Sequence, residues 1–430
     1  MLEYAKLQIG CLIIVLYIAF VYFSESMRTK HKYKHSMFDL IVIITIITLV
    51  LDGGTAVMVN HLDTVSMVLL DISHLFFYLS IDAFIFCIYL YLLEITERFP
   101  EDLKGKIILY APFVVNVLAV VWTVDDTVYI ENSLSNYSMG FAAVACYVMA
   151  FVYVVLAFYT FVRRKRYIEH HKRAAILVYM LTLAGTCIYQ ILIPEALVTS
   201  IAYTVIVIGM YVNQQNPALQ ELDHYHREMV MGFATLVEQR DDSTGAHIRR
   251  TSMYAELLAK ELQSQGYYKD TLTKDYIKNL ALAAPMHDVG KIAVPDGVLQ
   301  KPGKLTTEEF EVMKTHAAHG GEIILDTFSN LDNEEYMDMA YKVAHYHHEK
   351  WNGTGYPEGI KGDEIPLCAR IMAIADVFDA VSEKRCYRDA MPLEQCFVII
   401  EEGRGTHFDP TIVDVFLSIR PKVEAVHRNS

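Results

Sequence analysis

Residues 286–292 read MHDVGKI and residues 345–357 read HYHHEKWNGTGYP, and each stretch lies at the end of a segment with helical periodicity. Apolar residues recur at steps of three and four residues in these segments and in others of the same half of the chain. Few stretches of this half show the alternation that is typical of strands. The sequence therefore predicts an all-α fold here, with periodic segments at 253–262, 276–286, 310–324, 337–347 and 371–381.

Histidine and aspartate recur through this half in an ordered series. Imidazole and carboxylate ligands without sulfur suit iron, manganese or zinc. The seven cysteines are scattered and contain no Cys-x-x-Cys pair, which argues against a thiolate metal site or a disulfide framework. Two ions about 3.5–4 Å apart are a recurrent device for phosphoester hydrolysis. One histidine alone would predict little, and the prediction depends on five motifs in order: STGAHIRR (His247), MHDVGKI (His287, Asp288, Lys291), KTHAAHG (His316), HYHHEKWNGTGYP (His347, His348) and AIADVFDA (Asp376).

These motifs, together with IPLCARIMAIADVFDAVSEKRCYRDA at 365–390 and GTHFDP at 405–410, resemble the HD-GYP family of HD phosphohydrolases. The resemblance covers roughly residues 229–410. It implies an HD-GYP phosphohydrolase domain, which we place at 228–425. It also implies a metal-dependent phosphodiesterase that hydrolyses cyclic di-GMP to pGpG, with GMP as a further product.

The resemblance also implies a role for each matched residue. Asp288 would bridge two divalent metal ions, iron or manganese. Lys291, three residues after Asp288 on the same helical face, would stabilise the developing oxyanion. Asp288 and Lys291 are thus the implied catalytic residues. One ion is matched by His247, His287, Asp288 and Asp376, and the other by Asp288, His316, His347 and His348. The residues matched to substrate binding are Gly353, Gly355, Tyr356, Pro357, Arg385, Tyr387 and Arg388.

The substrate residues have a partly independent rationale. Glycines permit backbone conformations closed to other residues and proline ends the loop rigidly, so GTGYP suits a lip that approaches a ligand closely. Guanidinium groups grip phosphate and stack on guanine, although Arg385 and Arg388 could equally be structural.

Departures from the family pattern are few. Asn352 stands where the family commonly has aspartate, at a position that is not a matched ligand. Members with a third metal use a glutamate four residues before the first histidine, and here that position is Ser243. We therefore expect two metals. His319 and His345 match no ligand position and are interpreted as ordinary histidines.

The first half of the chain is strongly apolar. The whole chain is 53% hydrophobic and only 20% charged, which is unusual for a soluble protein. Most of its apolar runs reach the roughly 20 residues that a bilayer-crossing helix needs. Buried helices of a large soluble core are the alternative, and a cleaved signal peptide at 8–24 is disfavoured because the positive charge follows the apolar run. We predict a seven-helix membrane region at 1–213, with runs at 8–24, 38–60, 66–94, 107–124, 139–162, 174–193 and 196–213.

The loops between these runs differ in charge. Basic residues crowd 27–35, 98–106 and 163–173, whereas 60–65 and 124–138 carry acidic residues and no lysine or arginine. Basic loops stay in the cytoplasm. The alternation predicts a multi-pass protein of the plasma or inner membrane with its N-terminus outside and its catalytic domain in the cytoplasm.

Two further features bear on signalling. Asp52, Asp71, His74 and Asp82 lie inside predicted spans, where ionisable groups are costly and often functional, although some could lie near an interface. A linker helix at 214–243 begins with Asn216 and Pro217 and carries heptad rows at Leu222, Met229, Leu236 and at Leu219, His226, Phe233. It could form a parallel coiled coil in a homodimer, or simply pack on the next domain.

The expected function is a membrane-bound cyclic di-GMP phosphodiesterase regulated by a membrane sensory region. The alternatives are a receptor that binds the dinucleotide without cleaving it and a hydrolase of another cyclic dinucleotide. The expected partners are cyclic di-GMP, the lipid bilayer and a second copy of the chain. The net charge of -14 argues against a nucleic acid polymer as a partner.

Overall fold

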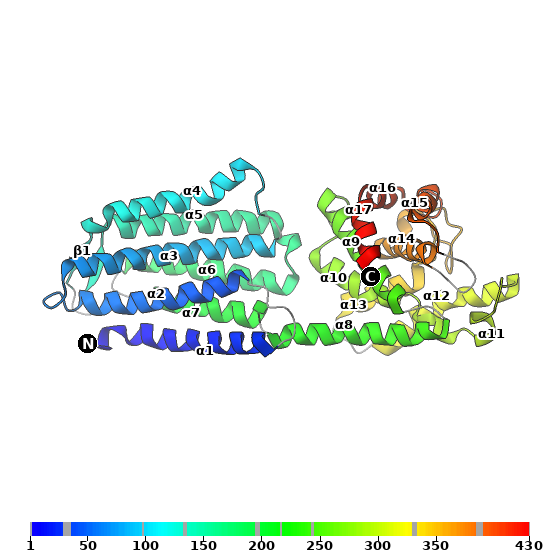
Figure 1. The fold of residues 1–430 in the computed structure, drawn as a ribbon, viewed down its shortest axis with the longest axis horizontal. Coiled ribbons are helices and arrows are strands. Elements are labelled where there is room, and N and C mark those ends of the chain that lie inside the picture. The colour runs from blue at the N-terminus through cyan, green and yellow to red at the C-terminus, as the bar shows by residue number, and fades with distance from the viewer. Residues whose placement is uncertain are drawn as a thin grey trace. The chain divides into compact units, whose positions relative to one another are not determined.

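The computed structural model describes residues 2–28, 36–96, 99–131, 136–193, 198–215, 217–241, 245–328, 333–383 and 390–429. The chain divides into two compact units, Met1–Glu221 and Leu222–Ser430. Helices build both of them (Figure 1). The predicted all-α class is therefore confirmed.

The N-terminal unit is a bundle of long helices that lie side by side (Figure 1). Its buried core runs through most of its helices and is rich in aromatic residues, among them Phe38, Phe84 and Tyr153. The helices are α1 (Lys6–Arg28), α2 (Met37–Val59), α3 (Met67–Ile95), α4 (Leu103–Thr123), α5 (Phe141–Arg164), α6 (His170–Leu192) and α7 (Thr199–Met210).

Six of these helices, α1 to α6, are long and apolar enough to cross a bilayer. The seventh, α7, has only 12 residues and continues into a five-residue π-helical turn, Tyr211–Gln215. At 1.5 Å per residue α7 is about 18 Å long, less than the roughly 30 Å of a hydrocarbon core. The predicted count of seven spans is therefore not confirmed, although α7 packs beside α1, α2 and α6.

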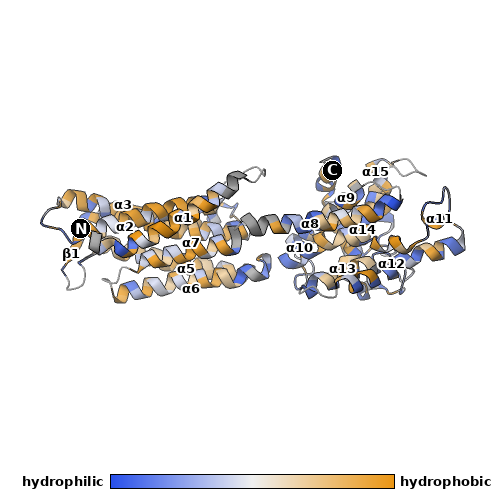
Figure 2. Ribbon diagram, turned by 90° about the horizontal axis from the view of Figure 1, so that it is seen from below, coloured by the Kyte–Doolittle hydropathy of each residue, from blue (hydrophilic) through white to orange (hydrophobic). Residues whose placement is uncertain are grey.

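The outer surface of the N-terminal unit is apolar, in the way that a lipid-facing surface requires. Hydrophobic colour covers much of its helices in Figure 2. Large apolar side chains point outward, for example Phe20, Leu118 and Trp122, which is 87% exposed. Water would penalise such a surface, and lipid would not.

A small hairpin interrupts the helical pattern. Strand β1 (Val128–Ile130) pairs antiparallel with β2 (Tyr137–Met139) in the connection between α4 and α5. The sequence pattern does not predict this hairpin, because each strand has only three residues.

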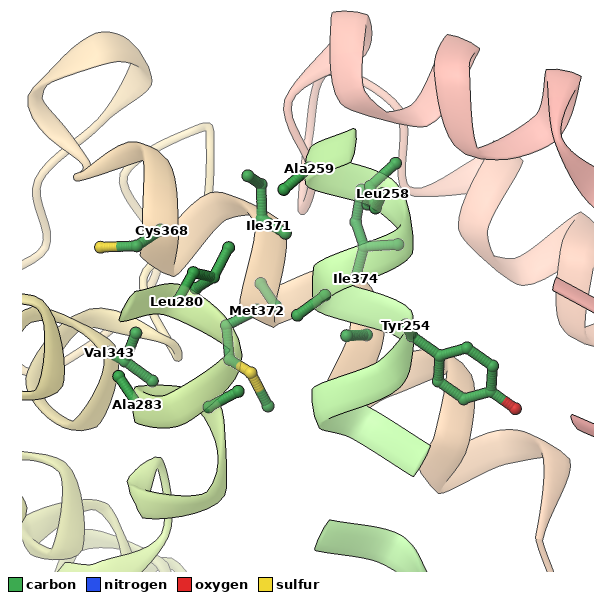
Figure 3. Packing of buried hydrophobic residues seen from close by; sticks show 14 of the residues in the cluster. Tyr254, Leu258, Ala259, Leu280, Ala283, Val343, Cys368, Ile371, Met372 and Ile374 are labelled. Atoms are coloured by element: carbon green, nitrogen blue, oxygen red, sulfur yellow. The ribbon is translucent and has the colours of Figure 1, made fainter. Parts of the chain in front are cut away.

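The C-terminal unit packs its helices around one apolar core. Helix α8 (Pro217–Glu238) leads into it from the boundary. The core joins Tyr254 and Leu258 of α9 to Leu280 of α10 and to Ile371 and Ile374 of α14 (Figure 3). The remaining elements are α9 (Gly245–Gln265), α10 (Lys274–Ala283), α11 (Asp296–Leu299), α12 (Thr307–Phe328), α13 (Glu334–Tyr346), α14 (Leu367–Ser382), α15 (Leu393–Glu402), α16 (Pro410–Ser418) and α17 (Arg420–Asn429).

Candidate metal centre

Five segments bring the predicted metal ligands together. His247 comes from α9, His316 from α12 and Asp376 from α14, while His347 and His348 directly follow α13. His287 and Asp288 lie between two short 3₁₀ helices, Ala284–Met286 and Val289–Ala293. All seven ligand side chains therefore converge from stretches that are distant in sequence.

Gly290 makes this convergence possible. A Cβ atom at Gly290 would lie 1.9 Å from the carbonyl oxygen of His316 and 2.4 Å from the backbone nitrogen of Gly320. Only glycine fits at so close an approach of two backbones. The 3₁₀ helix that follows Asp288 can therefore press against α12 and bring Asp288 beside His316.

A first cluster forms around His247. Its Nε2 atom lies 3.7 Å from Asp376 Oδ1 and 3.7 Å from Glu238 Oε1. His287 Nε2 lies 3.8 Å from the same Asp376 oxygen and 3.2 Å from Asp288 Oδ2. His247, His287 and Asp376 offer ligand atoms within 4.8 Å of one another, a spacing that a single metal ion can span.

A second cluster shares Asp288. Asp288 Oδ1 lies 3.3 Å from His316 Nε2 and 3.7 Å from His347 Nε2. His348 completes the group, with its ring centroid 4.9 Å from that of His316. One oxygen of Asp288 thus faces each cluster, as a carboxylate that bridges two ions would.

Hydrogen bonds fix which nitrogen of each histidine faces the site. The Nδ1–H of His287 donates to Ala284 O at 2.9 Å, that of His316 to Met313 O at 2.7 Å, and that of His347 to the carbonyls of Val343 and Ala344 at 3.0 Å. Their Nε2 atoms are left as acceptors. A backbone partner on the second nitrogen is the usual arrangement for a metal-bound histidine.

Several of these acceptors are buried and unsatisfied. The Nε2 atoms of His287, His316 and His347 and Oδ1 of Asp288 have no hydrogen-bond partner among the described residues. Buried polar atoms are rarely left unpaired, because each costs about 1–3 kcal/mol. Cations held in the two clusters would satisfy these four atoms, so the donor set fits divalent metal ions.

The local charges also suit metal binding. Burial opposes the charge of Asp288, but the ammonium of Lys291 holds the pKa of this carboxyl well below its usual range. Lys291 Nζ lies 2.8 Å from Asp288 Oδ2. Burial, with His347 and His316 nearby, holds the pKa of His348 well below its usual range. Asp288 is therefore anionic and His348 neutral at pH 7, as ligands must be.

The GTGYP segment borders the second cluster. Gly353 has φ +82°, and a Cβ at Gly355 would lie 2.3 Å from the backbone nitrogen of Lys350, so both positions require glycine. The ring of Tyr356 lies 4.7 Å from that of His348, and Pro357 follows through a cis peptide bond. The loop thus holds an aromatic ring beside the candidate metal ligands.

Some predicted positions cannot be compared with the structure. Arg385, Tyr387, Arg388 and Ser243 lie outside the described residues. His319 and His345, interpreted as ordinary histidines, bond to Glu322 and Glu358, at 3.0 Å in each case.

Three residues of the site were missed by the sequence analysis. Asp379 accepts a hydrogen bond from His247 Nδ1 at 2.7 Å and contacts Arg250 Nε at 2.5 Å. Glu238, at the end of α8, brings a third carboxylate within 4.8 Å of His247 and Asp288. Asp379 could have been suspected, since it lies one helical turn after Asp376, but no local pattern distinguishes Glu238.

Comparisons with known proteins agree with this geometry. Residues 234–412 match the family model described as HD domain. A probable cyclic di-GMP phosphodiesterase of Vibrio cholerae is 45% identical over 199 residues, which are 46% of this chain and 45% of that protein. A cyclic di-GMP phosphodiesterase of the same organism is 42% identical over 223 residues, 51% of this chain and 45% of that protein.

A third relative, also from Vibrio cholerae, is a 3'3'-cGAMP-specific phosphodiesterase 2. It is 42% identical over 197 residues, 46% of this chain and 35% of that protein. The chain spans less than half the length of each of these three relatives.

Proposed function

We propose, from the match of residues 234–412 to the HD domain family model, that the protein is a membrane-bound phosphodiesterase of cyclic di-GMP. The reaction would hydrolyse a 3′,5′-phosphodiester to give pGpG, with GMP as a further product. The observation that carries the proposal is the position of Asp288. Its two oxygens face separate groups of buried histidine Nε2 atoms.

Two divalent ions, iron or manganese, are the proposed cofactors. When bound, they would activate water and stabilise the displaced oxygen. One would be held by His247, His287, Asp288 and Asp376, and the other by Asp288, His316, His347 and His348.

The chain's own residues would do the remaining work. Lys291, with its ammonium next to Asp288, would offer a point positive charge to the phosphate oxyanion as charge develops. Tyr356 and the glycines Gly353 and Gly355 would form the lip over which a base lies, with Pro357 fixing the loop. Arg385, Tyr387 and Arg388 are proposed to contact the substrate.

The membrane unit and the linker helix complete the proposal. The basic loops favour a catalytic unit in the cytoplasm, and the bundle would serve as its sensory region. A homodimer is proposed through α8, whose exposed apolar row has the heptad spacing of a parallel coiled coil.

A second candidate function is hydrolysis of another cyclic dinucleotide, favoured by the similarity to a cGAMP-specific relative. A receptor that binds the dinucleotide without cleaving it is disfavoured, because every position matched to a metal ligand carries a histidine or an aspartate. Competition between cyclic di-GMP and 3'3'-cGAMP for one preparation would separate the two substrates.

The test uses the full chain in detergent, loaded with iron or manganese, and chromatography of the products from cyclic di-GMP. We expect Asp288→Ala and His316→Ala to lower turnover by more than about 100-fold and to lower the bound metal. His319→Ala is the matched control, since His319 lies one turn further along α12 with its side chain 45% exposed. Full turnover in Asp288→Ala or His316→Ala would refute the assignment.

A further inference from the structure

The N-terminal unit encloses a cavity among its helices. The cavity measures ≈ 100 Å³ and is lined from α2, α3, α5, α6 and α7, with β2 at one end. An engineered cavity of about 150 Å³ is known to bind benzene. This cavity is smaller, so it suits a molecule no larger than one small ring or a short chain.

Two of the four ionisable residues in the predicted spans line this cavity. Asp52 and His74 face it, and each is only 2% exposed. The other two are not among its lining residues: Asp71 accepts a hydrogen bond from Tyr129 at 2.8 Å, and Asp82 accepts one from Asn116 at 2.6 Å. Of these four ionisable side chains, the cavity is therefore lined by one carboxylate and one imidazole.

Both polar groups are arranged to accept hydrogen bonds. The Asp52 carboxylate accepts a hydrogen bond from the Ser200 hydroxyl and lies beside the Gln8 side chain, and it has further lone pairs to offer. His74 donates Nδ1–H to Leu70 O at 3.0 Å, which leaves Nε2 as an acceptor. A ligand that complements them must bring several N–H or O–H donors.

The cavity lining carries an acidic side chain without a lysine or arginine to balance it among the described residues. Among the described residues that line it, Asp52 is the only carboxylate and there is no lysine or arginine. A carboxylate at membrane depth is costly unless a positive partner accompanies it. A cationic ligand would supply that partner, whereas an anionic ligand would be repelled and a neutral one would leave the charge uncompensated.

The walls favour an organic cation over a metal ion. Tyr78, Tyr147 and Tyr203 line the cavity, and the ring of Tyr78 lies 5.8 Å from that of His74. Aromatic faces attract ammonium groups and pack against apolar bodies. A metal ion would require several oxygen or nitrogen ligands around one point, and the lining is mostly apolar and aromatic.

We propose that this cavity is a binding site for a small protonated amine with an apolar or aromatic body, with Asp52 as its counter-charge and His74 Nε2 as a hydrogen-bond acceptor. The site does not depend on the proposed phosphodiesterase activity, because it lies wholly within the N-terminal unit.

The test compares three probes of similar shape and of a size that suits the cavity, on the full chain in lipid nanodiscs: n-butylamine, 1-butanol and butyrate. Isothermal titration calorimetry should detect binding of the amine and weaker or no binding of the other two. Asp52→Asn should lower the affinity for the amine by about tenfold or more, because a charge-assisted contact is lost. Asp82→Asn is the matched control, a second buried carboxylate that lies outside the cavity, and it should leave the affinity unchanged.

A second measurement uses the unmutated chain, so it does not depend on whether the Asp52→Asn variant folds. Cys187 lines the same cavity. In the unmutated chain, aminoethyl methanethiosulfonate should modify Cys187 faster than sulfonatoethyl methanethiosulfonate, by about tenfold beyond the ratio for a free thiol in solution. Peptide mapping by mass spectrometry locates the label, and n-butylamine should slow the labelling of Cys187.

Three outcomes would overturn the proposal. The alcohol could bind as tightly as the amine, as an apolar or lipid-filled pocket would allow. The affinity for the amine could be the same in Asp52→Asn as in the unmutated chain. The two thiol reagents could modify Cys187 in the ratio found for a free thiol, without protection by the amine.

Discussion

Asp379 illustrates how a residue outside the predicted ligand set can control the metal centre. It holds the ring of His247 through Nδ1 and is itself bonded to Arg250 Nε and Nη2. Burial opposes its charge, but the hydrogen bonds from His247 and Arg250 hold the pKa of Asp379 below its usual range. It is therefore an anion that orients His247, a candidate metal ligand.

We expect Asp379→Asn to weaken metal binding by about 10–100-fold, the usual effect of removing such a partner. Metal titration followed by elemental analysis measures it, with turnover as a second readout. Asp414→Asn is the control, because Asp414 forms an exposed ion pair with Arg404 at 2.7 Å. Unchanged metal affinity in Asp379→Asn would show that Asp379 does not position His247.

The matched ligands could be read from the sequence because they are local motifs in a fixed order. Glu238 could not, because it approaches His247 only when the end of α8 packs beside the start of α9. The prediction that Asp288 and Lys291 share one face of a helix was wrong about the type of helix. The turn between them is a 3₁₀ helix, in which residues three apart lie directly above one another, and the 2.8 Å contact follows from that geometry.

His407 gives the C-terminal unit a defined acid sensitivity. Burial, and then Lys350, lower the pKa of His407 to about 4, and its ring stacks on Phe408 at 4.2 Å. The unfolded chain would bind this proton near pH 6.5. The fold thus favours the neutral ring, so this contribution to stability is full above about pH 6.5 and is lost as the pH falls toward 4.

We expect this loss to reach about 2–3 kcal/mol in the free energy of unfolding. Urea unfolding of the full chain at pH 7 and pH 4.5 measures it. Trp122→Phe leaves Trp351 as the single tryptophan, so that fluorescence reports the C-terminal unit. His407→Gln in the same background should lose less stability on acidification, and an equal loss in both chains would contradict the prediction.

At the scale of elements, side-chain exposure along α8 bears on the two interpretations of its periodicity, a coiled coil and packing on the next domain. Val230 and Ala234 are 6% and 3% exposed and belong to the core of the C-terminal unit. Leu222, Met229 and Leu236 occupy another face and are 64%, 58% and 64% exposed. Packing on the C-terminal unit therefore accounts for one row and leaves the heptad row uncovered.

If α8 pairs with a second copy in parallel, equivalent heptad positions face each other. We expect Met229→Cys to form a disulfide-linked dimer with mild oxidant. Glu228→Cys, one residue away and about 100° around the helix, should not. Non-reducing electrophoresis of the full chain reads the result against the unmutated chain. Equal cross-linking at both positions would argue against a specific pairing through this row.

The helices themselves were predictable from periodicity and apolar length, since both patterns reflect burial along a whole segment. The hairpin of β1 and β2 was not predictable, because three-residue strands carry too little pattern. The length of α7 was also misjudged. The apolar run 196–213 suggested a full span, but the α-helix ends at Met210 and a π-helical turn follows.

At the scale of the whole molecule, the number of crossings decides which side of the membrane holds the metal centre. Six crossings from an outside N-terminus would leave the C-terminal unit outside, away from a cytoplasmic dinucleotide. A seventh crossing by α7 would return it to the cytoplasm. The exposed Lys104 and Asp125, at opposite ends of α4, and the exposed Lys304 in the C-terminal unit report on these alternatives.

We expect a membrane-impermeant maleimide to label Asp125→Cys on intact cells, because the loop around it is acidic and basic loops stay inside. Lys104→Cys and Lys304→Cys should be labelled only after permeabilisation. The unmutated chain measures background from its own cysteines. Labelling of Lys304→Cys on intact cells, with Asp125→Cys also labelled, would mean that α7 does not cross. The phosphodiesterase proposal would then fail for its substrate, because the metal centre would be outside the compartment that holds it.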